Sequence, residues 1–170
     1  MSHQEHQGKA RASGKGVVAC GVMTVSDSRT RETDDSGRLL LERLPAAGHE
    51  IVRYEVVRDE PARIATLVQE FIAGGCQAVI LNGGTGIARR DSTFEAIDAL
   101  LEKRLPGFGE LFRMLSYGEI GAAAMLSRAT AGLYQGAVVI ALPGSPDAVR
   151  LALDALIVPE LSHLVWEIAR

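Results

Sequence analysis

The sequence contains few cysteines, and their spacing fits no cysteine-based site. Cys20 and Cys76 are the only ones among 170 residues. Two thiols this far apart match neither a zinc motif nor a Cys-x-x-Cys pair, and each lies in or beside an apolar run. A disulfide-stapled fold is therefore disfavoured, and we interpret both residues as small buried side chains in a reducing compartment.

Long hydrophobic runs are also missing. No stretch approaches the ~20 consecutive apolar residues that a membrane-spanning helix requires. Residues 1–15 lack the apolar core of a secretory signal. We therefore expect a cytoplasmic protein with no membrane partner. Residues 1–15 are polar and predict a disordered N-terminal tail, whereas residues 16–170 have a length that suits a single domain.

An excess of charge of one sign is absent as well. The formal net charge is -3 at pH 7, so there is no global basic field and nucleic acid is not an expected partner. The hydrophobic fraction of 47% and the charged fraction of 23% are those of an ordinary globular chain that buries one core. An anionic ligand would therefore have to be held by local features.

The familiar catalytic signatures do not occur. There is no His-Glu-x-x-His motif, and no Ser/His/Asp or Cys/His arrangement can be recognised. The glycine-rich segment at residues 83–86 is followed by no Gly-Lys-Ser/Thr, and it lacks the GxGxxG spacing of a dinucleotide site. Hydrolysis through a covalent nucleophile is thus disfavoured, and the positioning of phosphate groups is better supported.

Strand and helix patterns alternate over the first hundred residues. Runs of apolar residues predict strands at residues 16–25, 51–57 and 78–81, of which the second is more polar and suits a sheet edge. Apolar stripes at helical spacing predict helices at residues 35–47, 61–73 and 93–101. This alternation indicates the α/β class, with a mainly parallel sheet and helices on both faces.

Two of these helices carry signals at their first residues. Asp35 or Ser36 is expected to cap the first helix. Ser92 and Glu95 have the spacing of a capping box at the start of the third.

The second half of the chain departs from this rhythm. Helical pieces are expected at residues 107–117 and 120–126, with a break at Gly118. The apolar segment 106–126 would form an extra layer of the monomer or find its burial in a neighbouring subunit. Both alternatives remain open at this point.

A late hairpin and two helices complete the predicted elements. Residues 129–134 and 137–142 predict antiparallel strands joined at Gln135-Gly136. Helices are then expected over residues 147–157 and from Pro159 onward.

Four polar segments follow predicted strands. They are residues 26–30, 58–59, 82–91 and 143–146. Because ligands of open α/β sheets bind beyond the carboxyl ends of the strands, we expect all four segments to meet at one crevice.

The strongest of these segments is the glycine loop that follows Asn82. Glycines allow positive φ and close approach of a ligand, and successive N–H groups form a concavity that holds anions. Arg89 and Arg90 follow within a few residues and could neutralise phosphate oxygens. A simple turn and a solvated arginine pair are the alternatives. The loop residues concerned are Gly83, Gly84, Thr85 and Gly86.

Two aspartates are candidates for a magnesium site. Asp91 could hold an ion that bridges phosphate oxygens, and Asp59 ends the second strand at the same expected crevice. Each could instead cap a neighbouring helix. Among the hydroxyl groups, Ser26 and Ser145 could donate to a ligand, although an ordinary polar loop and a structural turn are equally open readings. Ser127-Arg128 could close the pocket.

Five ordered motifs resemble the MoaB/Mog family of molybdenum cofactor biosynthesis proteins. The similarity covers roughly residues 16–165, and SYGEIG is more similar to the MoaB branch than to the Mog branch. The motifs are VMTVSDSRTRETDDSG at 22–37, GGTGIARRDSTFEAI at 83–97, PGFGELFRMLSYGEIG at 106–121, MLSRATAG at 125–132 and LPGSPDAV at 142–149.

The resemblance implies a three-layer αβα fold that assembles as trimers or hexamers. It also implies a reaction, the adenylation of molybdopterin by Mg-ATP with release of pyrophosphate. The two acidic functional positions of the family fall on Asp59 and Asp91. Its ligand loops match the glycine loop, Ser127 and the loop Pro143-Gly144-Ser145. The alternative is a non-catalytic pterin carrier that acts as an oligomeric partner of other enzymes of the same pathway.

Overall fold

The computed structural model describes residues 16–169, and the tail predicted for residues 1–15 lies outside them. The described strands form one six-stranded sheet in the order β2-β1-β3-β6-β5-β4. The strands are β1 (Ala19–Val25), β2 (Glu50–Val57), β3 (Ala78–Asn82), β4 (Lys103–Arg104), β5 (Thr130–Tyr134) and β6 (Ala137–Leu142).

The sheet is mostly parallel, as predicted. β1 pairs in parallel with β2 and β3, and β3 pairs in parallel with β6. β5 is antiparallel to both β6 and β4. The hairpin turns at Gln135 and Gly136, whose φ angles of 48° and 76° fit the two-residue turn whose twist matches the strands. β2 lies at an edge of the sheet, which explains its partly exposed side chains.

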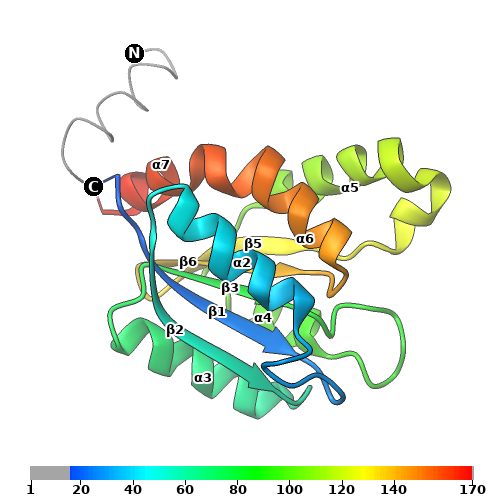
Figure 1. Ribbon diagram of the computed structural model, residues 1–170, viewed down its shortest axis with the longest axis horizontal. Coiled ribbons are helices and arrows are strands. Elements are labelled where there is room, and N and C mark those ends of the chain that lie inside the picture. Colours follow the sequence, from blue (N-terminus) through cyan, green and yellow to red (C-terminus); the bar gives the residue numbers. More distant parts are fainter. Residues whose placement is uncertain (1–15, 170) are drawn as a thin grey trace.

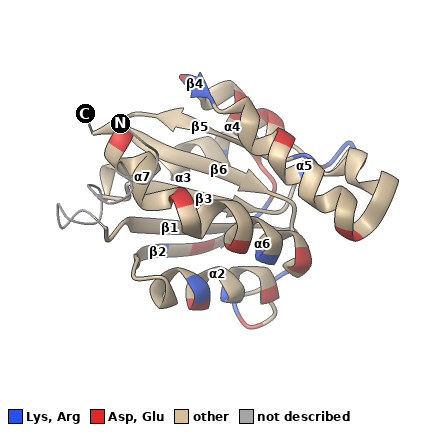
Figure 2. Cartoon of the chain, turned by 90° about the horizontal axis from the view of Figure 1, so that it is seen from above, with Lys and Arg blue, Asp and Glu red and all other residues tan. Residues whose placement is uncertain are grey.

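Helices cover both faces of the sheet and make a three-layer αβα sandwich. In Figure 1, α2, α5, α6 and α7 lie above the sheet, and α3 and α4 lie below it. Acidic and basic residues are interspersed over the upper helices (Figure 2). The helices are α2 (Asp35–Ala46), α3 (Pro61–Ala73), α4 (Thr93–Leu100), α5 (Pro106–Ile120), α6 (Pro146–Ala152) and α7 (Val158–Ile168).

The central strands supply side chains to two separate cores, which is why their sequences are continuous apolar runs. In β3, Ile80 joins the core under α2, α6 and α7, whereas Leu81 joins the core over α3 and α4. In β1, Val22 and Met23 divide in the same way. These buried strands form a rigid platform from which the loops at their ends project.

The predicted break at Gly118 is wrong. α5 runs unbroken to Ile120, because an exposed glycine costs a helix only about 1 kcal/mol. The chain turns instead at Gly121, whose φ of 61° ends the helix. A 3-10 segment, η1 (Gly121–Leu126), follows in place of the second α-helical piece.

The predicted separation of the two last helices is also wrong. α6 continues through a π-helical turn (Leu153–Ile157) directly into α7. Pro159 lies at the start of α7, where its missing N–H is tolerated. None of the helices within residues 16–169 is long and apolar enough to span a bilayer.

Smaller differences concern the ends of elements. The first strand begins at Ala19 and not at Gly16. The N-cap of α2 is Asp34, whose carboxylate accepts the Gly37 N–H, and not Asp35 or Ser36. The two-residue strand β4 was not predicted, because it exists only through pairing with β5.

Candidate functional site

Four parallel strands, β1, β2, β3 and β6, end on the same side of the sheet. The polar segments that follow them therefore lie side by side, as predicted from the sequence. The N–H of Ser26, after β1, donates to Val57 O of β2 at 2.8 Å. The N–H of Gly83, after β3, donates to Leu142 O of β6 at 3.0 Å. These bonds join the loops in two pairs, and the loops lie at the right of the sheet in Figure 1.

The glycine loop needs its glycines for two reasons. Gly83 and Gly84 have φ angles of 94° and 65°, which side chains rarely adopt. A Cβ on Gly83 would lie 2.1 Å from Val25 O. A Cβ on Gly84 would lie 2.1 Å from Thr93 Oγ1 and 2.3 Å from Asp59 Oδ2. The loop is therefore packed closely between β1, α4 and Asp59, which follows β2.

Successive backbone amides of this loop have no acceptor. Among the described residues, the N–H groups of residues 84–87 donate to no protein atom. Unpaired amides in series are the arrangement that binds phosphate or carboxylate oxygens. The start of α4, a few residues further on, adds the partial positive charge of a helix N-terminus.

Asp59 is buried, with 6% of its surface exposed, and it lies against the glycine loop. Its carboxylate accepts the Ser92 N–H at 3.1 Å and the Ser92 hydroxyl at 2.6 Å. It does not cap the helix that follows it, because Glu60 occupies that position. The capping box predicted at Ser92 is wrong, since its hydroxyl is used by Asp59 and Glu95 pairs with Arg128.

Asp91 contacts the far side of the same loop. Its Oδ2 accepts the Ala88 N–H at 3.2 Å, and a Cβ on Gly86 would lie 2.5 Å from that oxygen. Asp59 and Asp91 thus both touch the glycine loop, at Gly84 and Gly86 respectively. Both predicted acids therefore lie against the glycine loop, at two of its glycines.

Arg128 fixes the shape of the loop. Its guanidinium donates to Thr85 O at 2.8 Å and to Gly86 O at 2.6 Å. It also forms an ion pair with Glu95 and stacks on the Phe94 ring, with 4.8 Å to the ring centroid. Because Arg128 donates to two carbonyl oxygens of the loop, this side chain fixes the loop's backbone conformation. The adjacent Ser127 ends η1, and its N–H donates to Ala124 O.

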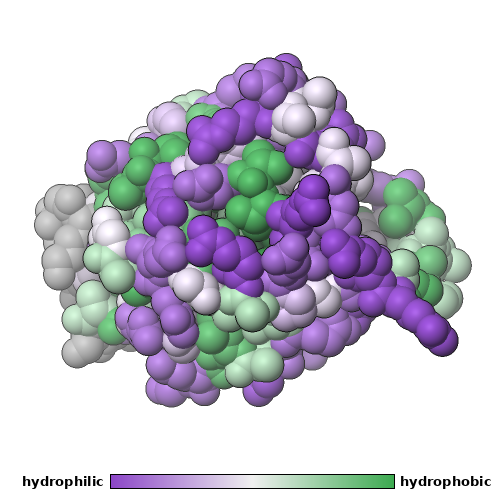
Figure 3. Space-filling view, turned by 90° about the horizontal axis from the view of Figure 1, so that it is seen from below, coloured by the Kyte–Doolittle hydropathy of each residue, from purple (hydrophilic) through white to green (hydrophobic). Residues whose placement is uncertain are grey.

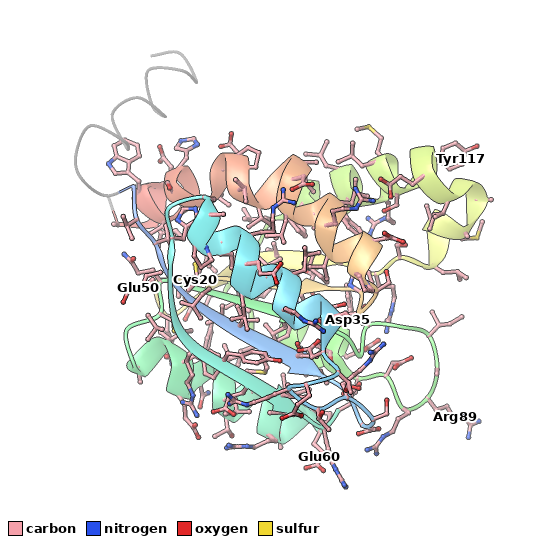
Figure 4. All side chains as sticks on the ribbon, viewed as in Figure 1. Cys20, Asp35, Glu50, Glu60, Arg89 and Tyr117 are labelled. Carbon is pink, nitrogen blue, oxygen red and sulfur yellow. The ribbon has the colours of Figure 1, made fainter. Side chains whose placement is uncertain are left out.

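The two predicted phosphate-binding arginines differ. Arg90 forms a bidentate pair with Asp27, at 2.7 and 3.0 Å, and this hydrogen-bonded guanidinium lowers the pKa of Asp27. Arg89 is exposed at the tip of the loop and points away from the body of the molecule (Figure 4). Within residues 16–169 it forms no ion pair, so its charge is available to a ligand.

The other predicted hydroxyl groups have local partners. Ser26 Oγ accepts the N–H groups of Ser28 and Arg29, which shapes the loop after β1. Ser145 caps α6 by accepting the Ala148 N–H at 3.2 Å. In both cases the oxygen acts as an acceptor, so the hydroxyl hydrogen can still be donated.

A small polar cavity lies beside the glycine loop, between β1 and the start of α2. Its volume is about 90 Å³, and Thr24, Asp34, Asn82 and Gly144 are among the residues that line it. Asp34 is 2% exposed and accepts the Tyr54 hydroxyl at 2.6 Å. Burial, followed by this hydrogen bond, raises the pKa of Tyr54.

Two buried polar atoms near the loop are unsatisfied. Within the described part of the chain, Asn82 Oδ1 and Thr93 Oγ1 are the buried side-chain atoms without a hydrogen-bond partner. They lie on either side of the glycine loop in sequence. Because buried polar groups are almost always paired, two unsatisfied atoms next to one loop are an unusual feature of this region.

The comparisons with known proteins agree with this geometry. A family model described as a probable molybdopterin binding domain matches residues 21–163. Molybdenum cofactor biosynthesis protein B of Bacillus subtilis (strain 168) is 53% identical over 176 residues, covering 100% of this chain and 99% of that protein. The chain belongs to the family of molybdenum cofactor biosynthesis protein B, MoaB.

Solved structures of MoaB proteins share the fold. A crystal structure of molybdenum cofactor biosynthesis protein B has a TM-score of 0.88 at 51% identity, covering 90% of this chain and 96% of that one. The tungsten cofactor synthesizing protein MoaB from Pyrococcus furiosus has a TM-score of 0.83 at 40% identity, covering 91% and 98%. Family membership places the chain in molybdenum cofactor biosynthesis.

Sequence reasoning missed several residues of this MoaB site. Asn82 was noted only as the residue before the glycines, and Asp34 was not singled out. A polar side chain at the last position of a buried strand was the available signal for Asn82. No local signal could have paired Asp59 with Ser92 or Asp34 with Tyr54, because these contacts join different elements.

Proposed function

We propose that this MoaB-family chain adenylates molybdopterin with Mg-ATP and releases pyrophosphate. The observation that carries the proposal is the set of unpaired amides at residues 84–87, flanked by Asp59 and Asp91. Amides favour phosphate oxygens, and carboxylates favour a cation that neutralises them. Nucleotidyl transfer suits such a set, because positioning and charge neutralisation supply most of its catalysis.

Magnesium fits the oxygen donors of the site. Mg²⁺ is usually held by one or two carboxylates together with waters and substrate phosphates. Asp59 and Asp91 supply such carboxylates, and both lie against the glycine loop. The donor set therefore suits an ion that also binds ATP. When bound, the ion would neutralise phosphate charge.

The residues of the chain would act by binding and orientation. The loop amides would hold the phosphates of ATP, while Arg90 is steadied by Asp27. A terminal phosphate oxygen of the pterin attacks the α-phosphorus of ATP, and the bond from that phosphorus to the bridging oxygen of pyrophosphate breaks. Ser26, Ser127 and the loop at residues 143–146 would line the substrate site and donate hydroxyl hydrogen bonds.

The test is the reaction itself. Purified protein incubated with molybdopterin, ATP and Mg²⁺ should release pyrophosphate and form adenylated pterin, both measured by chromatography. Absence of product under conditions where a Mog-type protein is active overturns the proposal.

Binding without chemistry is the second candidate function. The Asp27–Arg90 pair favours it, because a bidentate carboxylate partner occupies one of the two arginines expected to bind phosphate. Such a protein would carry or protect the pterin for other enzymes of the pathway. Tight pterin binding without measurable ATP binding would distinguish it from the adenylyltransferase.

We further propose that the chain assembles as a homotrimer or homohexamer in the cytoplasm, where ATP is available. Large apolar side chains remain exposed on α5 and η1, and hydrophobic residues appear at that end of the molecule in Figure 3. A monomer rarely exposes so many neighbouring apolar groups. They are Leu111, Met114, Tyr117, Ile120, Met125 and Leu126.

An apolar groove adjoins this surface. It has a volume of about 520 Å³ and lies between the start of α5 and the turn that joins α6 to α7. Phe108, Leu111 and Leu156 are among its lining residues. Leu111 belongs to both features, so the groove and the exposed face of α5 together offer one surface for a neighbouring subunit.

A further inference from the structure

Three consecutive peptide groups of the glycine loop are held by their carbonyl oxygens. Gly84 O accepts the N–H of Thr93 at 2.9 Å. Thr85 O and Gly86 O accept from the Arg128 guanidinium at 2.8 and 2.6 Å. The carbonyl side of this stretch is therefore bonded to the protein, whereas its N–H side donates to no protein atom within residues 16–169.

Holding a carbonyl also fixes the direction of an amide. In a planar trans peptide the C=O and the N–H point in opposite directions, and the N–H belongs to the following residue. The bond to Thr85 O therefore directs the amide of Gly86, and the bond to Gly86 O directs the amide of Ile87. Both amides face away from Arg128. In the same way, the bond from Thr93 directs the amide of Thr85.

Arg128 has little donor capacity left for a ligand of its own. Its Nε and one terminal nitrogen donate to the loop, and both terminal nitrogens donate to the Glu95 carboxylate. These hydrogen bonds lower the pKa of Glu95, so the carboxylate stays ionised and neutralises the guanidinium. Arg128 therefore acts on a bound anion through the loop and not by direct contact.

A cationic donor does more than orient the peptide groups. Charge-assisted hydrogen bonds are roughly twice as strong as neutral ones. Hydrogen bonds in series polarise one another, so a carbonyl that accepts from a guanidinium makes the N–H of its own peptide a better donor. Donors that are already aimed also need no rearrangement when an anion binds.

We propose that Arg128 is a positioning residue, which aims the amides of Gly86 and Ile87 at the phosphate oxygens of ATP. This inference rests on the proposed function, because it assumes a substrate that carries phosphate groups. It also divides the loop between two supports. Thr93, at the start of α4, aims one amide, and Arg128, between η1 and β5, aims two.

Amide resonances report the direction of these groups one by one. In ¹H–¹⁵N correlation spectra of the whole chain, inorganic pyrophosphate with Mg²⁺ should shift the amide signals of Thr85, Gly86 and Ile87. In Arg128→Met the shifts of Gly86 and Ile87 should be lost, and that of Thr85 should persist. Pyrophosphate should bind this variant at least about tenfold more weakly, because hydrogen bonds to a charged group are lost. A general loss of structure would change all three signals alike.

Arg104→Met is the matched control. Arg104 also donates to a carboxylate oxygen and to a backbone carbonyl, but both belong to Asp98 and not to the loop. This variant should keep the natural shifts and the natural affinity for pyrophosphate. Natural affinity and natural Gly86 and Ile87 shifts in Arg128→Met would overturn the inference.

Arg128→Lys keeps the test decisive if Arg128→Met fails to fold. An ammonium lacks the planar fork that serves two carbonyls, so pyrophosphate affinity should fall by at least about threefold and the Gly86 and Ile87 shifts should shrink. Natural affinity in this variant, or no pyrophosphate-induced shift in the natural sequence, rejects the inference.

The positioning function and the reaction can fail separately. A failed adenylation assay together with the expected amide shifts would reject the reaction and retain the positioning function of Arg128. Normal adenylation by the natural sequence, with amide shifts that do not depend on Arg128, would retain the reaction and reject the positioning function.

Discussion

Asp59 accepts both hydrogen-bond donors of Ser92, the backbone N–H at 3.1 Å and the hydroxyl at 2.6 Å. This carboxylate therefore anchors the start of α4, although it lies at the end of β2 in the sequence. The same carboxylate touches Gly84 of the glycine loop. Asp59 thus has a structural contact and a candidate catalytic position at once, and a substitution must be tested for both.

Asp59→Asn and Asp91→Asn separate these two properties. Both variants should reduce pyrophosphate release by about 10²-fold or more, because each removes a charge from the proposed metal site. Asp59→Asn should also lower the free energy of unfolding by about 1 kcal/mol, since an amide nitrogen replaces one acceptor of Ser92. Asp91→Asn should change that free energy by less than about 0.5 kcal/mol.

Urea unfolding and the pyrophosphate assay, performed on the same preparations, measure the two effects. If folded Asp59→Asn kept normal turnover, the residue would be a structural anchor of α4 alone. The proposed metal-binding function of Asp91 would then depend on the turnover of Asp91→Asn alone.

Alanine substitutions at two glycines test the constraint on the glycine loop. Gly84→Ala should destabilise the protein by at least about 2 kcal/mol, because its φ is 65° and its Cβ would collide with Thr93 and Asp59. Gly118→Ala is the control, since a Cβ there meets nothing within 4 Å. It should stabilise α5 by about 0.5–1 kcal/mol.

Thermal and urea unfolding of both variants provide the comparison. A loss of stability in Gly118→Ala would contradict the continuous helix from Pro106 to Ile120. Gly84→Ala with normal stability would mean that the loop can relax away from Asp59.

His49 should make the fold sensitive to acid. It is 7% exposed, its Nδ1 accepts the Val18 N–H at 3.3 Å, and burial lowers its pKa from the ordinary value of 6.5. Above pH 6.5 the ring is neutral in both the folded and the unfolded chain, so it contributes no pH dependence. As the pH falls from 6.5 through the lowered folded pKa, the unfolded chain binds the proton first and stability is lost.

His49→Gln removes this titration and keeps an acceptor for Val18. The variant should lose stability less steeply than the natural sequence between pH 6.5 and the folded pKa, by up to about 1.4 kcal/mol per pH unit. Denaturant unfolding at a series of pH values measures the slope. Parallel curves for the two proteins would show that His49 does not control acid stability.

The exposed face of α5 should hold the assembly together. Met114 is 61% exposed there, so Met114→Glu should place a charge in the subunit interface and shift the protein toward monomers. Val17→Glu, at a residue that is 58% exposed outside α5, is the control and should keep the natural mass. Sedimentation velocity measures the masses. A natural protein that sediments as a monomer would remove the proposal of a trimer or hexamer.

The sequence alone determined the class of fold and the region of the candidate site. Alternating apolar runs specified which segments become strands and helices, and the rule that parallel strands end at one edge placed the polar segments together. The glycines after Asn82 indicated the loop because few other residues tolerate positive φ. These properties depend only on residues that are close together in the sequence.

Only the tertiary structure decided which side chains meet. The pairing of Asp59 with Ser92, the contact of Arg128 with the Thr85 and Gly86 carbonyls, and the unsatisfied Asn82 oxygen all depend on packing between distant elements. The predicted end of α5 at Gly118 was wrong because a glycine can lie inside a helix. The helix ends at Gly121, where φ becomes positive, and the sequence does not show which glycine adopts that conformation. Hydrogen-bond geometry acts over a few ångströms in space, and sequence spacing does not report that distance.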